Sequence, residues 1–139
     1  MSTVVEALRR KKDILYEKGA TEEDIRTAEL NLGLLFSADY KEYLQHYGSV
    51  SCGGHELTGI TTDNNLDVVL VTKRNLKKNP SVTMPLYVIE ETHMDGIVVW
   101  QASTGEVFQT GYMDSPLKIY DSLVEYVSSF PEELQEQAD

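Results

Sequence analysis

The sequence predicts an α+β fold in which N-terminal helices and a C-terminal helix pack on a mainly antiparallel β-sheet. Apolar residues between Thr21 and Gly48 recur at helical spacing and are bounded by capping and stop residues. Beyond Pro80 the apolar period changes to two, which is typical of strands separated by turns. A helical period returns between Asp121 and Phe130, and we expect its apolar stripe to pack on the sheet.

The opening segment, from about Thr3 to Glu17, is expected to form a helix. Thr3 and Glu6 have the spacing of a capping box ahead of the apolar Leu8. The basic cluster at residues 9–12 is expected on the solvent-exposed face of this helix. A nucleic-acid role for this cluster is disfavoured, because the chain is acidic and no aromatic platform lies beside the cations.

Two short helices follow. The hydroxyl of Thr21 can cap the first, and Gly33 ends it. Ser37 can cap the second, and Gly48 is expected to stop it in a left-handed conformation. The apolar residues that share a face are Ile25, Ala28 and Leu32 in the first helix, and Tyr40, Tyr43, Leu44 and Tyr47 in the second.

This segment resembles the SUKH superfamily, which includes the Smi1/Knr-type cell-wall regulators of yeast and many bacterial immunity proteins. The matching elements are Ile25, Ala28 and Glu29, Leu32 and Gly33, Leu35 and Phe36, Asp39 to Lys41, Tyr43 and Leu44, Gly48, Gly53 and Gly54. The chain has Ser37 where the family usually has a proline, and its hydroxyl keeps the start of a helix. The resemblance continues more loosely to Phe130. It implies a SUKH-like fold and constrains function less, because members with this core do different jobs.

The stretch after this segment contains one ambiguous element. Gly53 and Gly54 open a loop into a short strand that is predicted to run from His55 to Thr61. Valines between residues 66 and 76 favour a strand there, whereas the leucines fit a helical stripe capped by Asn64 or Asn65. The resemblance favours the helix.

Three segments rich in β-branched and aromatic residues predict an antiparallel meander; they are residues 86–89, 97–100 and 107–109. Asp121 or Ser122 is expected to cap the last helix. The residues expected to be largely buried are Tyr40, Leu44, Trp100, Tyr126 and Phe130. Residues 1–130 are expected to form a single domain, followed by an acidic C-terminal tail or short helix at residues 131–139.

Composition limits the cellular setting. The one cysteine, Cys52, cannot form an internal disulfide, and the N-terminus lacks the apolar core of a signal peptide. We therefore expect a cytoplasmic protein. No apolar run approaches the roughly 20 residues of a membrane-spanning helix, so no membrane partner is expected.

The sequence predicts no catalytic residues, no metal site and no cofactor. His46, His55 and His93 are dispersed and lack the spacing of metal ligands. Cys52 could pair with His55, but nucleophilic catalysis also needs an orienting group and an oxyanion site, neither of which the sequence indicates. The consecutive acids at positions 90 and 91 are expected on opposite faces of a strand, so they cannot act as an acid/base couple.

Charge is distributed unevenly. The chain has 12 Lys and Arg against 23 Asp and Glu, a net charge of −11, and from Pro85 onward its only Lys or Arg is Lys118. Such acidity repels nucleic-acid phosphates and attracts basic partners. The simpler interpretation is that these charges serve solubility.

The resemblance and the charge together predict a cytoplasmic bacterial immunity protein that binds and neutralises a cognate toxin domain, with a nuclease as the expected toxin. A nuclease must be basic where it holds phosphates, so carboxylates presented there would compete with its substrate. The alternative is a regulatory or scaffold protein of the Smi1/Knr type. The toxin-binding candidates are Glu90, Glu91, Asp95, Glu106, Asp114 and Glu125. If the acidity serves only solubility, the interface is expected around residues 52–60.

Overall fold

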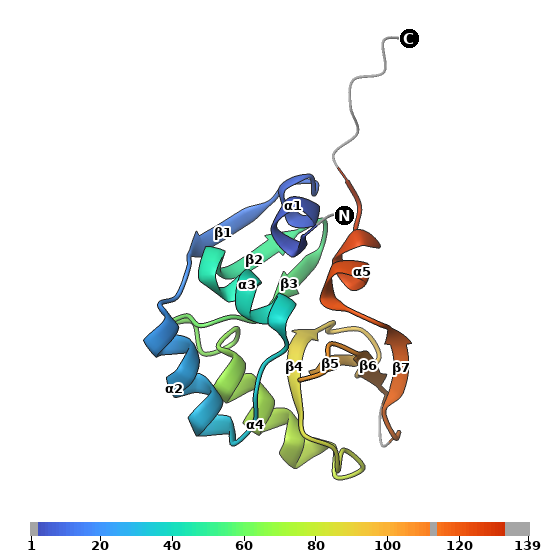
Figure 1. Ribbon diagram of the computed structural model, residues 1–139. Helices are drawn as coiled ribbons and strands as arrows, with labels where there is room; N and C mark the ends of the chain where they lie inside the picture. The colour runs from blue at the N-terminus through green and yellow to red at the C-terminus, as the bar shows by residue number, and fades with distance from the viewer. Residues whose placement is uncertain (1–2, 112–113, 133–139) are drawn as a thin grey trace.

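The computed structural model describes residues 3–111 and 114–132. Its helices and strands, in chain order, are α1 (Val4–Arg9), β1 (Leu15–Lys18), α2 (Glu22–Leu32), α3 (Ala38–His46), β2 (Tyr47–Cys52), β3 (His55–Leu57), α4 (Val68–Lys78), β4 (Leu86–Glu91), β5 (Val98–Ala102), β6 (Val107–Thr110), β7 (Leu117–Tyr120) and α5 (Leu123–Ser128) (Figure 1). None of the helices in this part of the chain is long and apolar enough to cross a membrane. The predicted α+β class, with an antiparallel sheet, is confirmed.

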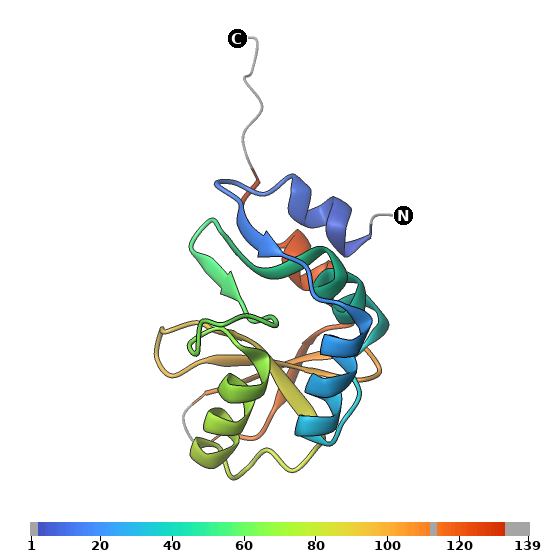
Figure 2. The same ribbon diagram turned by 90° about the vertical axis from the view of Figure 1, so that its left-hand side faces the viewer.

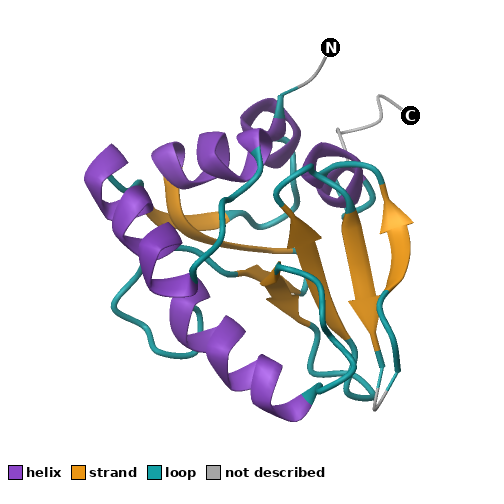
Figure 3. Cartoon of the chain, turned by 60° about the horizontal axis from the view of Figure 1, so that its bottom comes forward, coloured by secondary structure: helices purple, strands orange, loops and turns teal. Residues whose placement is uncertain are grey.

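The seven strands form one antiparallel sheet whose spatial order follows the chain order, from β1 to β7. β3 and β4 are joined through the single residue pair Leu57 and Glu90. The sheet therefore has two parts, a three-stranded part (β1–β3) and a four-stranded meander (β4–β7). Figure 3 shows α2 and α4 one beyond the other along one flank of the sheet, and the two helices contact each other.

Two groups of buried side chains hold the helices on the sheet. The larger group joins α1, α2, α3 and α5 to one side of the sheet, and the smaller joins α4 to the other side of the meander. The five residues predicted to be largely buried are each at most 6% exposed, which confirms the prediction. Trp100 lies in the smaller group, and its Nε1 donates to Thr110 Oγ1 at 3.0 Å.

The predicted N-caps of α1, α2, α3 and α5 are confirmed. Thr3 and Glu6 form a capping box, and the Thr21 hydroxyl accepts from the amide of Asp24 at 3.1 Å. The Ser37 and Ser122 hydroxyls cap α3 and α5. Gly33 ends α2 with φ of 68°, a left-handed conformation that suits glycine.

The opening helix is shorter than predicted. It ends at Arg9 instead of Glu17, and Asp13 has φ of 54°, so the backbone leaves the helical region before β1 begins at Leu15. Lys11 is not on a solvent-exposed face, since it is only 1% exposed. Its Nζ donates to the carbonyls of Ser128 and Phe130, at 3.5 and 3.3 Å, and pairs with Glu132 at 3.1 Å. This lysine fastens the end of α5 to the end of α1.

Gly48 does not stop α3 in a left-handed conformation, because the helix passes directly into β2 at Tyr47. Gly48 is needed instead for close approach of the backbone. A Cβ there would lie 2.5 Å from the Lys18 carbonyl oxygen, and a Cβ on Gly59 would lie 1.7 Å from the Gly48 oxygen. The strand predicted to reach Thr61 ends at Leu57.

The ambiguous segment is the helix α4, as the resemblance favours. Its cap is Asp67, rather than Asn64 or Asn65, and the Asp67 carboxylate accepts from the amide of Leu70 at 3.4 Å.

The segment after α5 is held by the N-terminal part of the chain. The Pro131 carbonyl accepts from the Lys12 amide at 3.1 Å. Pro131 and Glu132 are not helical, and the rest of the predicted tail, residues 133–139, lies outside the described residues.

Two carboxylates of the segment between Thr21 and Gly48, those of Asp39 and Glu29, accept hydrogen bonds inside the protein. Asp39 Oδ1 accepts from Ser37 Oγ at 2.6 Å and from Gln101 Nε2 at 3.1 Å. Its other oxygen accepts from the amide of Leu123 at 2.7 Å, at the start of α5. Glu29 likewise accepts from the backbone amide of Phe36 at 2.8 Å. These carboxylates tie α2, α3, α5 and β5 together.

Candidate functional site

One face of the three-stranded part of the sheet is not covered by any helix of residues 3–111 and 114–132. Strand pairing places Leu15 beside Ser51 and Ser51 beside Glu56, so these three side chains share a face. The opposite face carries Val50 and Leu57, which are buried in the larger core group. Leu15, by contrast, is 71% exposed, and Glu56 is exposed. We call the side with Leu15, Ser51 and Glu56 the outer face. Figure 2 shows β1 to β3 in the upper left part of the molecule, with α1 above them and the other helices to the right and below.

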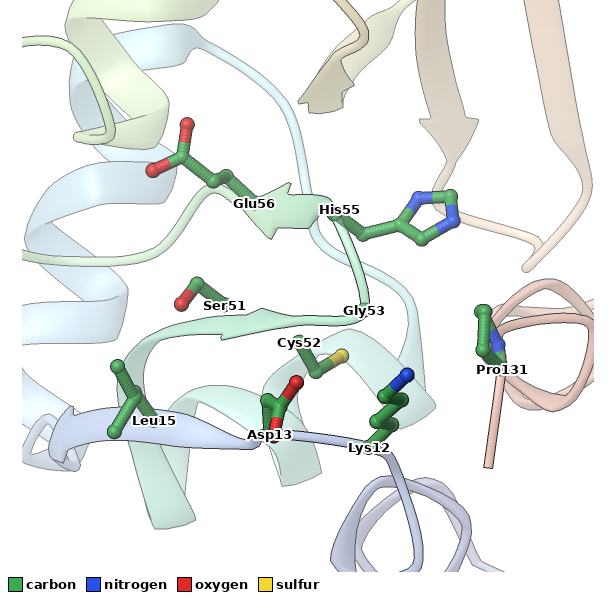
Figure 4. Close-up of a pocket in the computed structure, with 10 residues that line it drawn as sticks. Lys12, Asp13, Leu15, Ser51, Cys52, Gly53, His55, Glu56 and Pro131 are labelled. Carbon is green, nitrogen blue, oxygen red and sulfur yellow. The ribbon is translucent and has the colours of Figure 1, made fainter. Parts of the chain in front are cut away.

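Two hollows open on this face, each of about 610 Å³. The first lies at the hairpin between β2 and β3, and its lining includes Lys12, Asp13, Leu15, Ser51, Gly54, Glu56 and Pro131 (Figure 4). The second lies between β3, α4 and the end of β4, and its lining includes Glu56, Asp63, Asn65, Arg74, Lys78, Glu91 and His93. Because Glu56 lines both, the two hollows adjoin at this residue.

The hairpin tip that bounds the first hollow is held rigidly. Gly53 and Gly54 have φ of 51° and 85°, so both turn positions need the left-handed conformation that glycine adopts easily. The Gly53 amide donates to the Lys12 carbonyl at 3.0 Å. A Cβ on Gly53 would lie 3.3 Å from the Pro131 ring, so proline packs directly against the tip.

Glu90, a predicted contact residue, is 2% exposed and its carboxylate is used inside the protein. His55 Nδ1 donates to its two oxygens at 3.0 and 3.1 Å, because an ionised carboxylate can only accept. The Glu56 amide donates to it at 3.2 Å, and the Tyr126 hydroxyl also donates to it. Burial and the Glu90 charge raise the pKa of Tyr126, which keeps this phenol protonated as a donor. The His55 ring stacks on Phe130 with centroids 3.7 Å apart. Glu90 therefore joins β3, β4 and α5.

Cys52 lies opposite His55 in the hairpin but the structure does not pair them chemically. The His55 nitrogen that is hydrogen-bonded serves Glu90. Cys52 is 3% exposed, and burial raises its pKa to about 11, so the thiol stays protonated at neutral pH. Across residues 3–111 and 114–132 no group of three or more His, Cys, Asp or Glu side chains is placed to hold a metal ion.

Glu91 faces α4, whereas Glu90 faces α5, as the strand alternation predicts. Arg74 Nη2 donates to Glu91 Oε1 at 3.0 Å, and Asn75 Nδ2 donates to its other oxygen at 2.6 Å. Glu91 lines the second hollow, so it is the one predicted contact residue that borders the outer face.

The other four predicted contact residues lie at the two ends of the meander. Asp95 and Asp114 are exposed in the connections that follow β4 and β6, which antiparallel pairing brings to the same end. Glu106 precedes β6 at the opposite end, where it pairs with Lys118 at 3.4 Å. Glu125 is exposed on α5, close in sequence to the end of β7. The six predicted residues therefore do not form one surface.

Sequence reasoning missed the carboxylates of the first hollow and its rim. Asp13 and Glu17 are exposed on or beside β1, and Glu56 is exposed on β3. The prediction of a helix through Glu17 concealed two of them. Glu56 could have been found from its place directly after the Gly53–Gly54 turn, which fixes strand alternation in a two-residue hairpin.

A family model described as SUKH_5: SMI1-KNR4 cell-wall matches residues 1–130 of the chain. A comparison with curated proteins finds no match to the sequence.

Proposed function

The chain belongs to the SUKH_5 family, described as SMI1-KNR4 cell-wall, and from this premise we propose that it is an immunity protein that binds and neutralises one cognate toxin protein. Membership supports an immunity-type or Smi1/Knr-like protein, and the family is generally non-catalytic. The toxin, its expected nuclease activity and a bacterial cytoplasmic setting belong to the proposal.

The observation that carries the proposal is the uncovered outer face of β1–β3. It combines two adjoining hollows, an apolar side chain that is 71% exposed at Leu15, and the exposed carboxylate of Glu56 between the hollows. Apolar anchors surrounded by charged groups are typical of protein interfaces. At the end of the meander with Asp95 and Asp114, Met94 and Leu117 are also exposed, at 66% and 62%, but these residues line neither of the two hollows of about 610 Å³. We therefore place the toxin on the outer face, with Glu91 at its border.

The proposed inhibition is steric and electrostatic. A nuclease holds phosphates with cationic side chains, so an acidic protein seated on that surface excludes the substrate and associates rapidly at low salt. Glu90 is not proposed as a contact, because its carboxylate is already bonded to His55 and Tyr126.

The test is co-expression with the toxin encoded by the adjacent upstream gene. We expect the chain to rescue growth and Glu56→Lys to weaken rescue, because it reverses the charge between the hollows. The matched control is Glu22→Lys, an equal charge change at the exposed start of α2. If growth arrest persists while both proteins are soluble, the immunity function is wrong. If Asp95→Lys or Glu106→Lys abolishes rescue while Glu56→Lys does not, the interface lies on the meander ends.

The alternative is a regulatory or scaffold protein of the Smi1/Knr type, which the family description itself favours. An immunity gene should lie directly beside a gene for a large secreted protein with a toxin domain at its end. A regulator's gene should not. The gene neighbourhood therefore separates the two functions before any binding experiment.

A further inference from the structure

β1 is an edge strand of the sheet. Its backbone pairs with β2 along one edge, and no strand among the described residues pairs with its other edge. Leu15 and Tyr16 are 71% and 62% exposed, although both are large and apolar for an edge position. We propose that this edge binds an extended segment of the partner protein as an additional strand, with a cationic side chain beside Glu17 and apolar side chains beside Leu15 and Tyr16. Strand addition at β1 depends on the proposed immunity function only in that this function identifies the partner as the toxin.

The geometry of β1 suits strand addition. An edge strand presents a row of backbone donors and acceptors that a second chain can pair with, and side chains on alternate positions then supply selectivity. The pairing of β1 with β2 contains an irregularity between the pairs Tyr16–Val50 and Lys18–Tyr47, where β1 advances two residues and β2 advances three. The extra residue therefore lies in β2, and β1 remains regular. Leu15 also lines the first hollow, which gives the partner's side chains on the outer face a place to pack.

Charge favours a cationic segment. Glu17 lies two residues after Leu15 in β1, so it shares Leu15's side of the strand, and Asp13, just before the strand, lines the first hollow together with Leu15. Neither forms an ion pair with a Lys or Arg of residues 3–111 or 114–132. Glu17 Oε1 accepts only a neutral hydrogen bond, from Thr61 Oγ1 at 2.7 Å. Cross-strand pairs of opposite charge stabilise a sheet, whereas like charges destabilise it.

A second copy of this chain is a poorer occupant of the edge. In a two-fold antiparallel pairing, facing residues must lie on the same side of the sheet. Centring the pair on Tyr16 sets Leu15 against Glu17, and centring it on Leu15 brings Glu17 towards Asp13, just before the strand. Centring it on Glu17 sets that carboxylate against itself. Every such register either mismatches the apolar residue or brings carboxylates together, so a segment of different sequence is favoured.

The proposal is tested on the full chain by NMR titration with the peptide acetyl-Thr-Arg-Val-Val-Thr-Lys-amide. In an antiparallel pair its arginine would face Glu17, and its lysine would lie beyond the start of β1, towards Asp13. We expect amide shifts confined to residues 13–18 and their β2 neighbours, with a Kd of about 1 mM. The peptide with glutamates in place of both cations should bind at least about fivefold more weakly. N-methylation of the two valines should abolish binding, because it removes backbone donors. Shifts centred elsewhere, equal binding of both charge forms, or no shift at all would overturn the proposal.

Variants separate this proposal from the proposed function. Glu17→Lys should reverse the preference between the two peptides, whereas Leu30→Lys, at a leucine of α2 that is 76% exposed, should not change it. With the toxin in hand, rescue by the unaltered chain tests immunity alone. Once rescue is established, loss of rescue in both Glu17→Lys and Leu15→Lys supports the edge as the docking site. Full rescue by both variants would overturn strand addition and leave immunity intact.

Discussion

Asp39 is expected to be the carboxylate on which the docking of α5 depends most. Its Oδ2 accepts from the Leu123 amide at 2.7 Å, and its Oδ1 accepts from Gln101 Nε2 at 3.1 Å. Leu123 and Gln101 are 1% and 0% exposed, so water cannot readily replace the lost acceptor. Asp39→Ala should therefore leave buried donors without a partner and loosen the start of α5.

The expected magnitude follows from these contacts. A hydrogen bond to a charged group contributes about 1.5 to 3 kcal/mol, and an unsatisfied buried donor costs about 1 to 3 kcal/mol. Gln101 keeps a second bond, from Nε2 to the Gly105 carbonyl at 2.9 Å, and the Ser37 hydroxyl can turn away. The loss is thus dominated by the Leu123 amide. We expect Asp39→Ala to lower the free energy of unfolding by about 3 kcal/mol, and Asp39→Asn, which keeps one acceptor, by about half as much.

Urea unfolding followed by tryptophan fluorescence measures this loss, since Trp100 is buried in the fold. With a slope of about 2 kcal/mol per molar urea, the midpoint should fall by about 1.5 M. Asp114→Ala is the matched control, because Asp114 is exposed and its backbone carbonyl, which the substitution keeps, is the group that accepts from the Ser81 hydroxyl. A change within about 0.5 kcal/mol for Asp39→Ala, equal to the control, would show that Asp39 does not hold α5.

Two further predictions concern buried groups. Because burial raises the pKa of Cys52 from 9.0 to about 11, its alkylation by iodoacetamide at pH 7.5 should be about 100-fold slower in the native than in the unfolded chain. The free energy of unfolding should also fall as the pH rises from about 9 towards 11, since the unfolded thiol ionises first, and Cys52→Ala should reduce this fall. The part due to buried tyrosines such as Tyr126, whose pKa is also raised, should remain. A native thiol as reactive as the unfolded one would contradict both predictions. Trp100→Ala should lower the free energy of unfolding by about 3 to 5 kcal/mol in urea titrations, against little change for Leu117→Ala at a residue that is 62% exposed. A loss below about 1 kcal/mol would mean that Trp100 does not anchor the smaller core group.

Four of the N-caps, the end of α2 and the first three strands of the meander could be predicted from local sequence, because their signals are short-range. Thr21 and Ser37 bond to amides three residues away, and Gly33 needs only its own φ angle. The turn at Gly96 and the flanking β-branched runs similarly define β4 and β5 without reference to distant residues.

The three-stranded part could not be predicted because its strands depend on distant partners. Apolar residues of the opening segment also fit a helical stripe, and only the antiparallel pairing of Leu15 with Ser51 makes it a strand. β2 lacks a clear alternation, since Tyr47, Gly48, Ser49 and Val50 are all buried. β7, at residues 117–120, likewise is a strand through its pairing with β6.

The candidate site was predicted only in part for the same reason. Charge counting identifies acidic residues but cannot separate the buried Glu90 from the exposed Asp95, because burial of Glu90 requires His55 and Tyr126 to converge on it. The outer face was missed with β1. The region of residues 52–60, kept as the second possibility, does contain Glu56 and the tip of the hairpin.

The carboxylates of Glu29 and Asp39 accept hydrogen bonds inside the protein. The side chains of Leu15, Glu17 and Glu56, by contrast, are exposed and take no part in these bonds. Substitutions at such exposed positions typically change stability by less than about 0.5 kcal/mol. Under the proposed immunity function, a lineage of these proteins can therefore exchange one toxin for another through a few surface codons while the interior stays unaltered. Two descendants could be nearly identical in sequence and still fail to protect each other's hosts. Cross-protection between such relatives should accordingly follow the side chains of β1 and β3 more closely than overall sequence identity.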